Sequence, residues 1–162
     1  MVTALNVANN ILQRAFADDI NVTPMKLQKL IYCIYKEYLK KTGYSLFEED
    51  FEAWKYGPVI PSVYQMFKDR GSNRINNYAD ANKGIYKAVN ENNKAPFKQI
   101  VDKIWSIYKD YNGIVISSFT YGKNTAWRNA VKERRNQLLV SDIKSEEDYV
   151  GKRSFDYHCR CR

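Results

Sequence analysis

Side chains that could perform acid–base or nucleophilic chemistry are scarce in this sequence of 162 residues. The chain contains one histidine, His158, which lies close to the C-terminal end. Ser-His-Asp and Cys-His sites require an imidazole that is held by a fixed scaffold, so neither kind of catalytic site is expected. The sequence has no glycine-rich nucleotide motif and no Cys-x-x-Cys pair. We therefore expect no catalytic residues, and an enzyme that uses carboxylates alone is the least favoured alternative.

Two other groups of side chains could bind metals or protons. The run His158-Cys159-Arg160-Cys161 contains zinc-competent donors, but three donors at a flexible chain end do not complete a rigid tetrahedral site. Four carboxylates within residues 48–52 form an acidic cluster, which favours a solvated loop over a catalytic pair. We predict no metal site and no cofactor, and we expect residues 152–162 to form a flexible tail.

The net charge of the chain is +8, and it is unevenly distributed. Residues 82–162 contain 16 of the 26 Lys and Arg residues but only half of the 18 acidic residues. This excess favours an anionic partner, and it leaves open whether that partner is an acidic protein or a nucleic acid. No apolar run approaches the roughly 20 residues that cross a bilayer, and the N-terminus does not resemble a signal peptide. We expect a cytoplasmic protein that does not enter a membrane.

The hydrophobic pattern predicts a mainly α protein. The chain is 44% hydrophobic and includes 13 Tyr, 7 Phe and 3 Trp, which is enough apolar surface for one packed core. We predict a compact helical bundle of about six to seven helices, with a small β element near residues 50–56. Residues 1–151 form the predicted single domain.

The second predicted helix has the strongest signals. Thr23 is the expected N-cap, Pro24 occupies the first turn, and Gly43 ends the helix in a left-handed conformation. One face is apolar, and the lysines on the opposite face are expected to form a solvated ridge. The apolar face includes Leu27, Leu30 and Ile31, and the ridge includes Lys26, Lys29, Lys36 and Lys40.

The other elements are predicted from their start and stop signals. The segment up to Tyr56 is expected to be extended and to turn at Gly57-Pro58, whereas the asparagine-rich residues 71–94 read as a loop. The run from Ile114 to Phe119 fits a strand or a helix equally well. The remaining predicted helices are Thr3 to Phe16, Pro61 to Gly71, Pro96 to Asn112-Gly113, a short helix after Thr125, and a helix start at the capping-box pattern Ser145–Asp148.

Two blocks of the sequence resemble a known family. The first is Pro24-Met25-Lys26-Leu27-Gln28-Lys29-Leu30-Ile31-Tyr32, which continues after Gly43 and Leu46-Phe47 with Glu52-Ala53-Trp54-Lys55-Tyr56-Gly57-Pro58-Val59-Ile60-Pro61 and Val63-Tyr64. The second block is Ser118-Phe119-Thr120-Tyr121, followed by Trp127-Arg128. These blocks are similar to the pattern of the Panacea domain, also described as SocA-like or phage-associated GepA-like, and the resemblance extends over roughly residues 4 to 150.

The second block departs from the family pattern at two positions. Tyr121 stands where the family commonly has His, so a role for that histidine is not carried over. Ala126 stands where the family has Pro. The tryptophan and the basic residue of the pattern are present as Trp127 and Arg128.

The resemblance implies a mainly helical antitoxin that neutralises a cognate protein toxin by direct binding. Some relatives act as adaptors that deliver the toxin to an ATP-dependent protease. The family pairs with unrelated toxins, so the resemblance does not identify the target. A basic nucleic-acid-binding regulator is the main alternative that the charge of the chain leaves open.

The motif residues are of two kinds. Trp and Tyr supply large, rigid contact areas, which dominate binding when they are buried at the centre of an interface. The same rings can also belong to the core, and for Trp54 both readings remain open. The toxin-binding candidates are Trp54, Lys55, Tyr56, Tyr64, Lys68, Tyr121 and Arg128. The residues of the motif with an expected structural role are Leu27, Leu30, Ile31, Gly57, Pro58 and Trp127.

Overall fold

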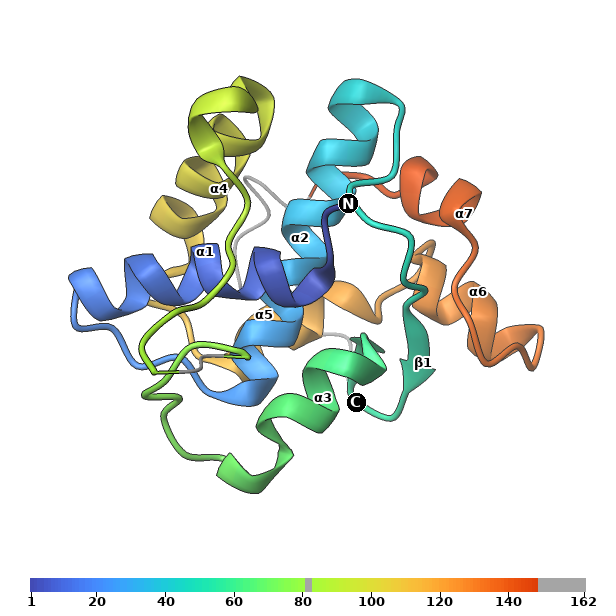
Figure 1. Cartoon of the computed structure of the whole chain (residues 1–162). Helices are drawn as coiled ribbons and strands as arrows, with labels where there is room; N and C mark the ends of the chain where they lie inside the picture. The colour runs from blue at the N-terminus through green and yellow to red at the C-terminus, as the bar shows by residue number, and fades with distance from the viewer. Residues whose placement is uncertain (81–82, 149–162) are drawn as a thin grey trace.

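The computed structural model describes residues 1–80 and 83–148, and this part of the chain is mainly helical. Helix α2 runs through the middle and contacts α1, α3, α4, α5 and α7 as well as strand β2 (Figure 1). The expected helical bundle with a small β element is confirmed. In order, the elements are α1 (Ala4–Ala17), α2 (Pro24–Thr42), β1 (Glu52–Trp54), β2 (Gly57–Val59), α3 (Pro61–Phe67), η1 (Lys68–Arg70), η2 (Glu91–Asn93), α4 (Ala95–Tyr108), α5 (Gly113–Thr120), α6 (Ala126–Lys132) and α7 (Val140–Ser145).

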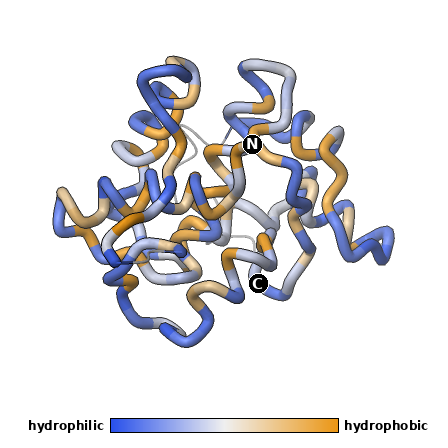
Figure 2. The backbone as a smooth tube through the Cα atoms, in the orientation of Figure 1, coloured by the Kyte–Doolittle hydropathy of each residue, from blue (hydrophilic) through white to orange (hydrophobic). Residues whose placement is uncertain are grey.

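The ends of α1 and α2 form where the sequence signals them. The side chain of Thr3 accepts a hydrogen bond from the backbone of Asn6, whose own side chain accepts one from the Thr3 amide, so α1 begins with a capping box. Thr23 caps α2 in the same way, and Gly43 ends it with a φ of 79°. The core packs against these two helices, and hydrophilic stretches occupy outer turns such as those after α3 and α6 (Figure 2).

Helix α2 is buried from Lys26 to Lys36, so the prediction of a solvated lysine ridge is wrong for the first three of its four lysines. The side chains of Lys26, Lys29 and Lys36 are 4%, 1% and 1% exposed, and only Lys40 is partly accessible. Because neighbouring elements surround α2, its lysine faces also lie inside the molecule. Each ammonium group donates to a backbone oxygen, which reduces the cost of burying the charge. These oxygens belong to Lys109 (2.5 Å), Pro58 (2.8 Å) and Glu147 (3.3 Å), respectively.

A β-hairpin forms at the end of the segment that was predicted to be extended, but the predicted turn at Gly57-Pro58 is wrong, because the turn lies at Lys55-Tyr56 and Gly57-Pro58 belong to β2. Strands β1 and β2 pair in antiparallel register, with Glu52 opposite Val59 and Trp54 opposite Gly57. The other side of β1 is also occupied: the Ala53 amide donates to the Asn136 oxygen (2.7 Å), and the Leu138 amide donates to the Phe51 oxygen. The sequence indicated neither the second strand nor the contact with residues 136–138.

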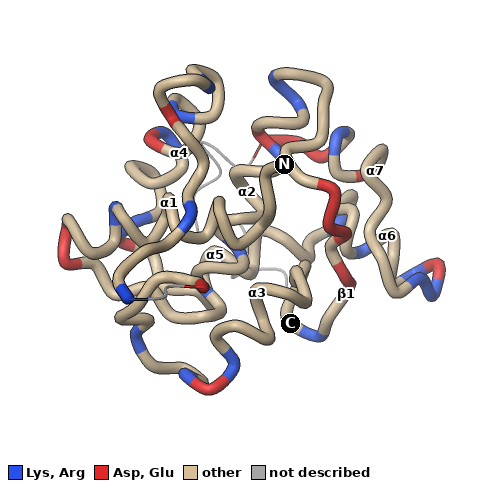
Figure 3. Tube along the Cα trace, viewed as in Figure 1, with Lys and Arg blue, Asp and Glu red and all other residues tan. Residues whose placement is uncertain are grey.

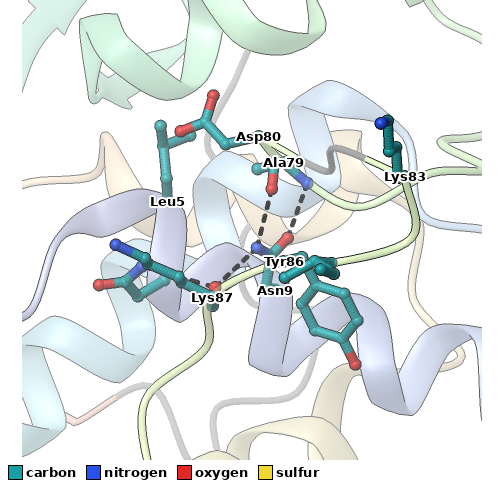
Figure 4. A pocket seen from close by; sticks show the side chains of 9 residues that line it. Leu5, Asn9, Ala79, Asp80, Lys83, Tyr86 and Lys87 are labelled. Carbon is teal, nitrogen blue, oxygen red and sulfur yellow. Dashed lines mark hydrogen bonds between the residues drawn. The ribbon is translucent and has the colours of Figure 1, made fainter.

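Residues 72–90, described without 81–82, form a strap that lies across α1. The expected loop-rich connection is therefore confirmed. Asn9 donates to the oxygens of Ala79 (3.1 Å) and Lys87 (2.8 Å) and accepts from the Ala79 amide, as Figure 4 shows. Asn10 makes the same pair of bonds with the backbone of Val89. The two asparagines, both buried, thus hold the strap against the helix.

Two predicted helix boundaries differ from the structure. Asn112 does not simply end the preceding helix, because its side chain accepts from the Val115 amide and caps α5. Ser145 ends α7 instead of starting a helix, so the predicted capping box there is wrong. Glu146 instead accepts a hydrogen bond from the Ala126 amide (2.7 Å), at the first residue of α6. The acidic side chain does meet a helix start, but one that is distant in sequence.

The tail predicted for residues 152–162, with its histidine and two cysteines, lies outside the described residues, and the predicted domain boundary stays a prediction. Within residues 1–80 and 83–148, no helix is long and apolar enough to cross a membrane.

Candidate protein-binding surface

The turn of the hairpin brings the first set of candidate residues to the surface. The Trp54 ring packs edge-on against Tyr64 of α3, with ring centroids 4.7 Å apart. Its indole N–H donates to the Glu52 carboxylate at 2.6 Å. Lys55 and Tyr56 form the turn itself, and the Lys55 ammonium lies over the Tyr56 ring, 5.3 Å from its centroid. The hairpin thus presents aromatic rings together with the Lys55 ammonium group.

The second block of the motif packs against the back of this hairpin. The indole N–H of Trp127, in α6, donates to the Trp54 oxygen at 2.6 Å. Tyr121 lies beside Trp127 with centroids 5.8 Å apart. Arg128 covers the Trp127 ring at 5.2 Å and donates to the Tyr121 oxygen at 2.9 Å. Two blocks that lie some 60 residues apart in sequence therefore meet at one place.

We call this region the aromatic hairpin surface, and its residues differ in exposure. Tyr56 and Tyr64 are 56% and 41% exposed, whereas Trp127 is only 9% exposed and anchors the hairpin. Lys68 begins η1, one helical turn beyond Tyr64. Trp54 is partly buried. Its exposure is therefore intermediate between that of a core residue and that of an exposed interface residue, the two roles that the sequence left open. The surface consists of Trp54, Lys55, Tyr56, Tyr64, Tyr121 and Arg128, with Trp127 beneath it.

Polar side chains of α2 hold the hairpin from below. The Gln28 amide donates to the Ile60 oxygen (3.0 Å) and accepts from the Ile60 amide (2.9 Å). Lys29 donates to the Pro58 oxygen, and burial lowers the pKa of its ammonium group to about 7. These bonds satisfy the backbone groups of residues 58–60 that face α2. The hairpin is therefore fixed in place by side chains rather than by further strands.

Gly57 is required where the hairpin meets α5. Its φ of 110° lies in a region that side chains rarely adopt. A Cβ atom there would lie 2.5 Å from the Thr120 hydroxyl and 3.1 Å from the Lys29 ammonium. Ser117, also in α5, donates to the Tyr56 oxygen. Only glycine allows the turn to approach α5 this closely.

The acidic cluster has a structural role that the sequence analysis did not predict. Glu49 accepts from the Ala4 amide at 2.6 Å and from the Ser62 hydroxyl at 2.5 Å, so it joins the starts of α1 and α3. The expectation of a purely solvated cluster is therefore wrong for Glu49 and for Glu52, which binds Trp54. Figure 3 shows acidic residues grouped along the segment that leads into β1.

Apart from the aromatic hairpin surface, a concave region lies between α1 and the strap. It encloses about 480 Å³, and the Asn9 side chain at its wall is directed to the strap backbone (Figure 4). The described part of the chain contains no group of three or more His, Cys, Asp or Glu residues that could hold a metal. The lining residues are Leu5, Asn6, Asn9, Ala79, Asp80, Lys83, Ile85, Tyr86 and Lys87.

The aromatic hairpin surface lies within the segment that matches a known family. The model of the family described as "Antitoxin SocA-like, Panacea domain" matches residues 27–128, from Leu27 in α2 to Arg128 in α6. The chain belongs to this family. The match covers both blocks of the motif except Pro24-Met25-Lys26, and it includes every residue of the aromatic hairpin surface.

One curated relative of this Panacea-domain chain is the antitoxin SocA of Caulobacter vibrioides (strain NA1000 / CB15N). The two sequences are 44% identical over 78 residues, which is 48% of this chain. The aligned segment spans 42% of the relative, so less than half of that antitoxin's length is matched. No solved structure matches the chain.

The structure also shows which residues of the Panacea motif the sequence analysis missed. Lys29 was predicted to be solvated and Gln28 was given no role, yet both bind the hairpin backbone. Ser117 and Thr120 were not singled out. Ser117 donates to the Tyr56 oxygen, and the Thr120 hydroxyl lies against Gly57. The sequence did contain one signal for them. Gln28 and Lys29 are part of the family pattern, and a polar residue that a pattern specifies is more often bound to another part of the protein than solvated.

Proposed function

We propose that this protein is an antitoxin that neutralises a cognate protein toxin by binding it through the aromatic hairpin surface. The observation that carries the proposal is the meeting of both family motif blocks at one exposed surface. A motif that only stabilised the core would have no need of Tyr56 and Tyr64, which are about half exposed. Family membership supplies the antitoxin role, since the family description and the curated relative are both named for it.

The geometry favours binding over catalysis. The hairpin backbone that carries these rings is held by Gln28 and Lys29 and lies close to α5 at Gly57, so little backbone entropy is lost when a partner binds. A stable complex buries about 1,600 Å² in total, and a few aromatic or arginine anchors dominate its energy. The proposed mechanism is therefore sequestration of the toxin by a preformed surface, and the protein acts without breaking a covalent bond.

Growth rescue tests this proposal directly. The product of the neighbouring gene is expressed alone and then together with this protein, and we expect toxicity that co-expression relieves. The two proteins should also co-purify. Absence of rescue and of co-purification would count against the antitoxin role. A shorter toxin half-life in the presence of an ATP-dependent protease would indicate an adaptor, and an unchanged half-life would indicate sequestration alone.

Matched tyrosine variants test the surface itself. Tyr64→Ala and Tyr56→Ala should weaken rescue, because each removes an exposed anchor of the surface. Tyr111→Ala is the control, since Tyr111 is 42% exposed, as Tyr64 is, but follows α4. Equal loss of rescue in all three variants would show that the aromatic hairpin surface has no special role.

A further inference from the structure

The exposed rings of the aromatic hairpin surface are not arranged as a stacking platform. Trp54 and Tyr64 are inclined by 63°, and Tyr121 and Trp127 are inclined by 58°. Arg128 covers one face of Trp127, and Lys55 covers one face of Tyr56. Successive nucleic-acid bases stack on open ring faces, and these rings offer few of them.

What the surface does present is a set of hydrogen-bond donors that carry positive charge. Lys55 and Arg128 have eight N–H donors between them and no acceptor, as follows from their chemistry. One of these donors, from Arg128, binds the Tyr121 oxygen. Neither side chain forms an ion pair with any residue in the described ranges 1–80 and 83–148. Both cations are therefore available to an external anion.

The two cations are held in one unit. Lys55 follows Trp54, Arg128 follows Trp127, and the two tryptophans are joined by the hydrogen bond from the Trp127 indole to the Trp54 oxygen. Glu52 is the one carboxylate of hairpin residues 52–59, and it accepts a hydrogen bond from the Trp54 indole. Lys55 and Arg128 outweigh its single negative charge, so the local charge is positive, and the tyrosine hydroxyls at the edge add further donors.

From this arrangement we propose that the partner presents an acidic protein segment to the aromatic hairpin surface, with Asp or Glu carboxylates bound by Lys55 and Arg128. The inference rests on the proposed function and adds the chemistry of the partner. Charge complementarity selects an acidic segment, and the inclined rings select a protein over a nucleic acid. The aromatic edges pack against the aliphatic parts of the same segment.

Binding of poly-L-glutamate to the full-length protein tests this inference without the toxin. Tryptophan fluorescence reports binding, because Trp54 is partly exposed at this surface and Trp127 lies directly beneath it. The double variant Lys55→Gln, Arg128→Gln should raise the Kd for poly-glutamate roughly tenfold or more, since it removes two charge-assisted hydrogen-bonding groups. Arg128→Lys, which keeps the charge, should retain most of the binding.

The control variant changes the same net charge at another place. Lys94→Gln, Lys98→Gln alters the start of α4, which lies across the molecule from β1 (Figure 1), and its Kd should change little. Equal weakening in both double variants would mean that only the overall charge matters, and this would overturn the inference. So would tighter binding of an oligouridylate with the same sensitivity to Lys55 and Arg128.

Two further results separate the inference from the proposed function. If Arg128→Gln unfolds the protein, Lys55→Gln alone repeats the test, because Lys55 has no hydrogen-bond partner in the described part of the chain. If growth rescue is intact but Lys55→Gln leaves poly-glutamate binding unchanged, the acidic partner is rejected and the antitoxin role stands. If poly-glutamate binds as expected but no rescue occurs, the antitoxin role is rejected.

Discussion

At the scale of single residues, buried polar side chains hold the aromatic hairpin surface in place. Lys29 sits beneath the hairpin at 1% exposure, donates to the Pro58 oxygen, and lies 3.1 Å from the position of a Cβ on Gly57. The Lys29 side chain thus supports the backbone of the hairpin instead of extending into solvent. Its cost is the removal of an ammonium group from water.

Gly57→Ala should destabilise the protein by about 3 kcal/mol, the sum of backbone strain at positive φ and of crowding against Thr120. Urea unfolding at neutral pH measures this loss. Gly43→Ala is the matched control, because Gly43 also has a positive φ but has no atom within 4 Å of the added Cβ. The control should lose about 1 kcal/mol. Equal losses would show that the approach of the turn to α5 is not tight.

Lys29 should make stability rise with pH above neutrality. Because burial lowers its pKa from 10.5 to about 7, the folded protein binds fewer protons than the unfolded chain between these values. The free energy of unfolding then increases by at most about 1.4 kcal/mol per pH unit as the pH rises. Urea unfolding of the wild type and of Lys29→Met, between about pH 7 and about pH 8.5, checks this expectation.

The variant should show a smaller rise than the wild type. Burial also lowers the pKa of Lys26 and of Lys36, so part of the rise should remain in the variant. Burial raises the pKa of Cys33 to about 12, but this opposes stability only above the ordinary thiol range. Identical pH profiles would mean that Lys29 is charged to the same extent in both states.

At the scale of elements, the sequence predicted the helices well because their end signals are local. Thr3, Thr23, Gly43 and Thr125 all act at helix ends where the sequence places them. Local signals do not predict a helix end whose backbone groups are hydrogen-bonded by a residue far away in the sequence. Glu146 serves the start of α6 rather than its own segment, and no spacing rule links it to Ala126.

The candidate surface was only partly predictable for the same reason. The aromatic residues were identified from the motif, but their support came from α2, which reads as an amphipathic helix with a polar face. Whether that face is solvated depends on how many neighbours surround the helix, and this is a property of the whole fold. Gln28 was therefore given no role, although its side chain binds both the amide and the oxygen of Ile60.

Gln28→Leu should destabilise the protein by about 1–3 kcal/mol, because it leaves the buried amide of Ile60 without a partner, while the Ile60 oxygen keeps its hydrogen bond from the Tyr64 amide. The Ile60 amide should also exchange its hydrogen faster, which mass spectrometry or NMR can follow. Gln65→Leu, at an exposed position of α3, is the control and should be nearly neutral. Unchanged exchange at Ile60 would mean that Gln28 does not fix the hairpin.

At the scale of the whole molecule, the last described residues connect to the centre. Glu146 is 1% exposed, accepts from the Tyr32 hydroxyl at 2.5 Å, and lies 3.9 Å from the Lys36 ammonium. It thereby links α2, α6 and the segment after α7. Lys40 donates to the backbone oxygen of Glu146 and to the Asp148 carboxylate.

Glu146→Gln should keep the hydrogen bonds from Tyr32 and Ala126 but remove the carboxylate charge that lies 3.9 Å from the buried Lys36 ammonium. We expect a loss of about 3 kcal/mol in the free energy of unfolding, as is typical when one member of a buried pair is removed. Glu48→Gln, at an exposed position, is the control. Adding Lys36→Met to Glu146→Gln should recover part of the loss, and strict additivity in this cycle would argue against the pair.

The small sheet has one more consequence for how a partner could attach. β1 is bordered by β2 on one side and by residues 136–138 on the other, while Gln28, Lys29 and Ser117 occupy backbone groups around β2. No edge of the described sheet is left for another chain to extend by strand addition, which also protects against aggregation through strand pairing. If a partner binds as proposed, its selection then depends on the exposed side chains, and substitutions among them would change the target without altering the backbone.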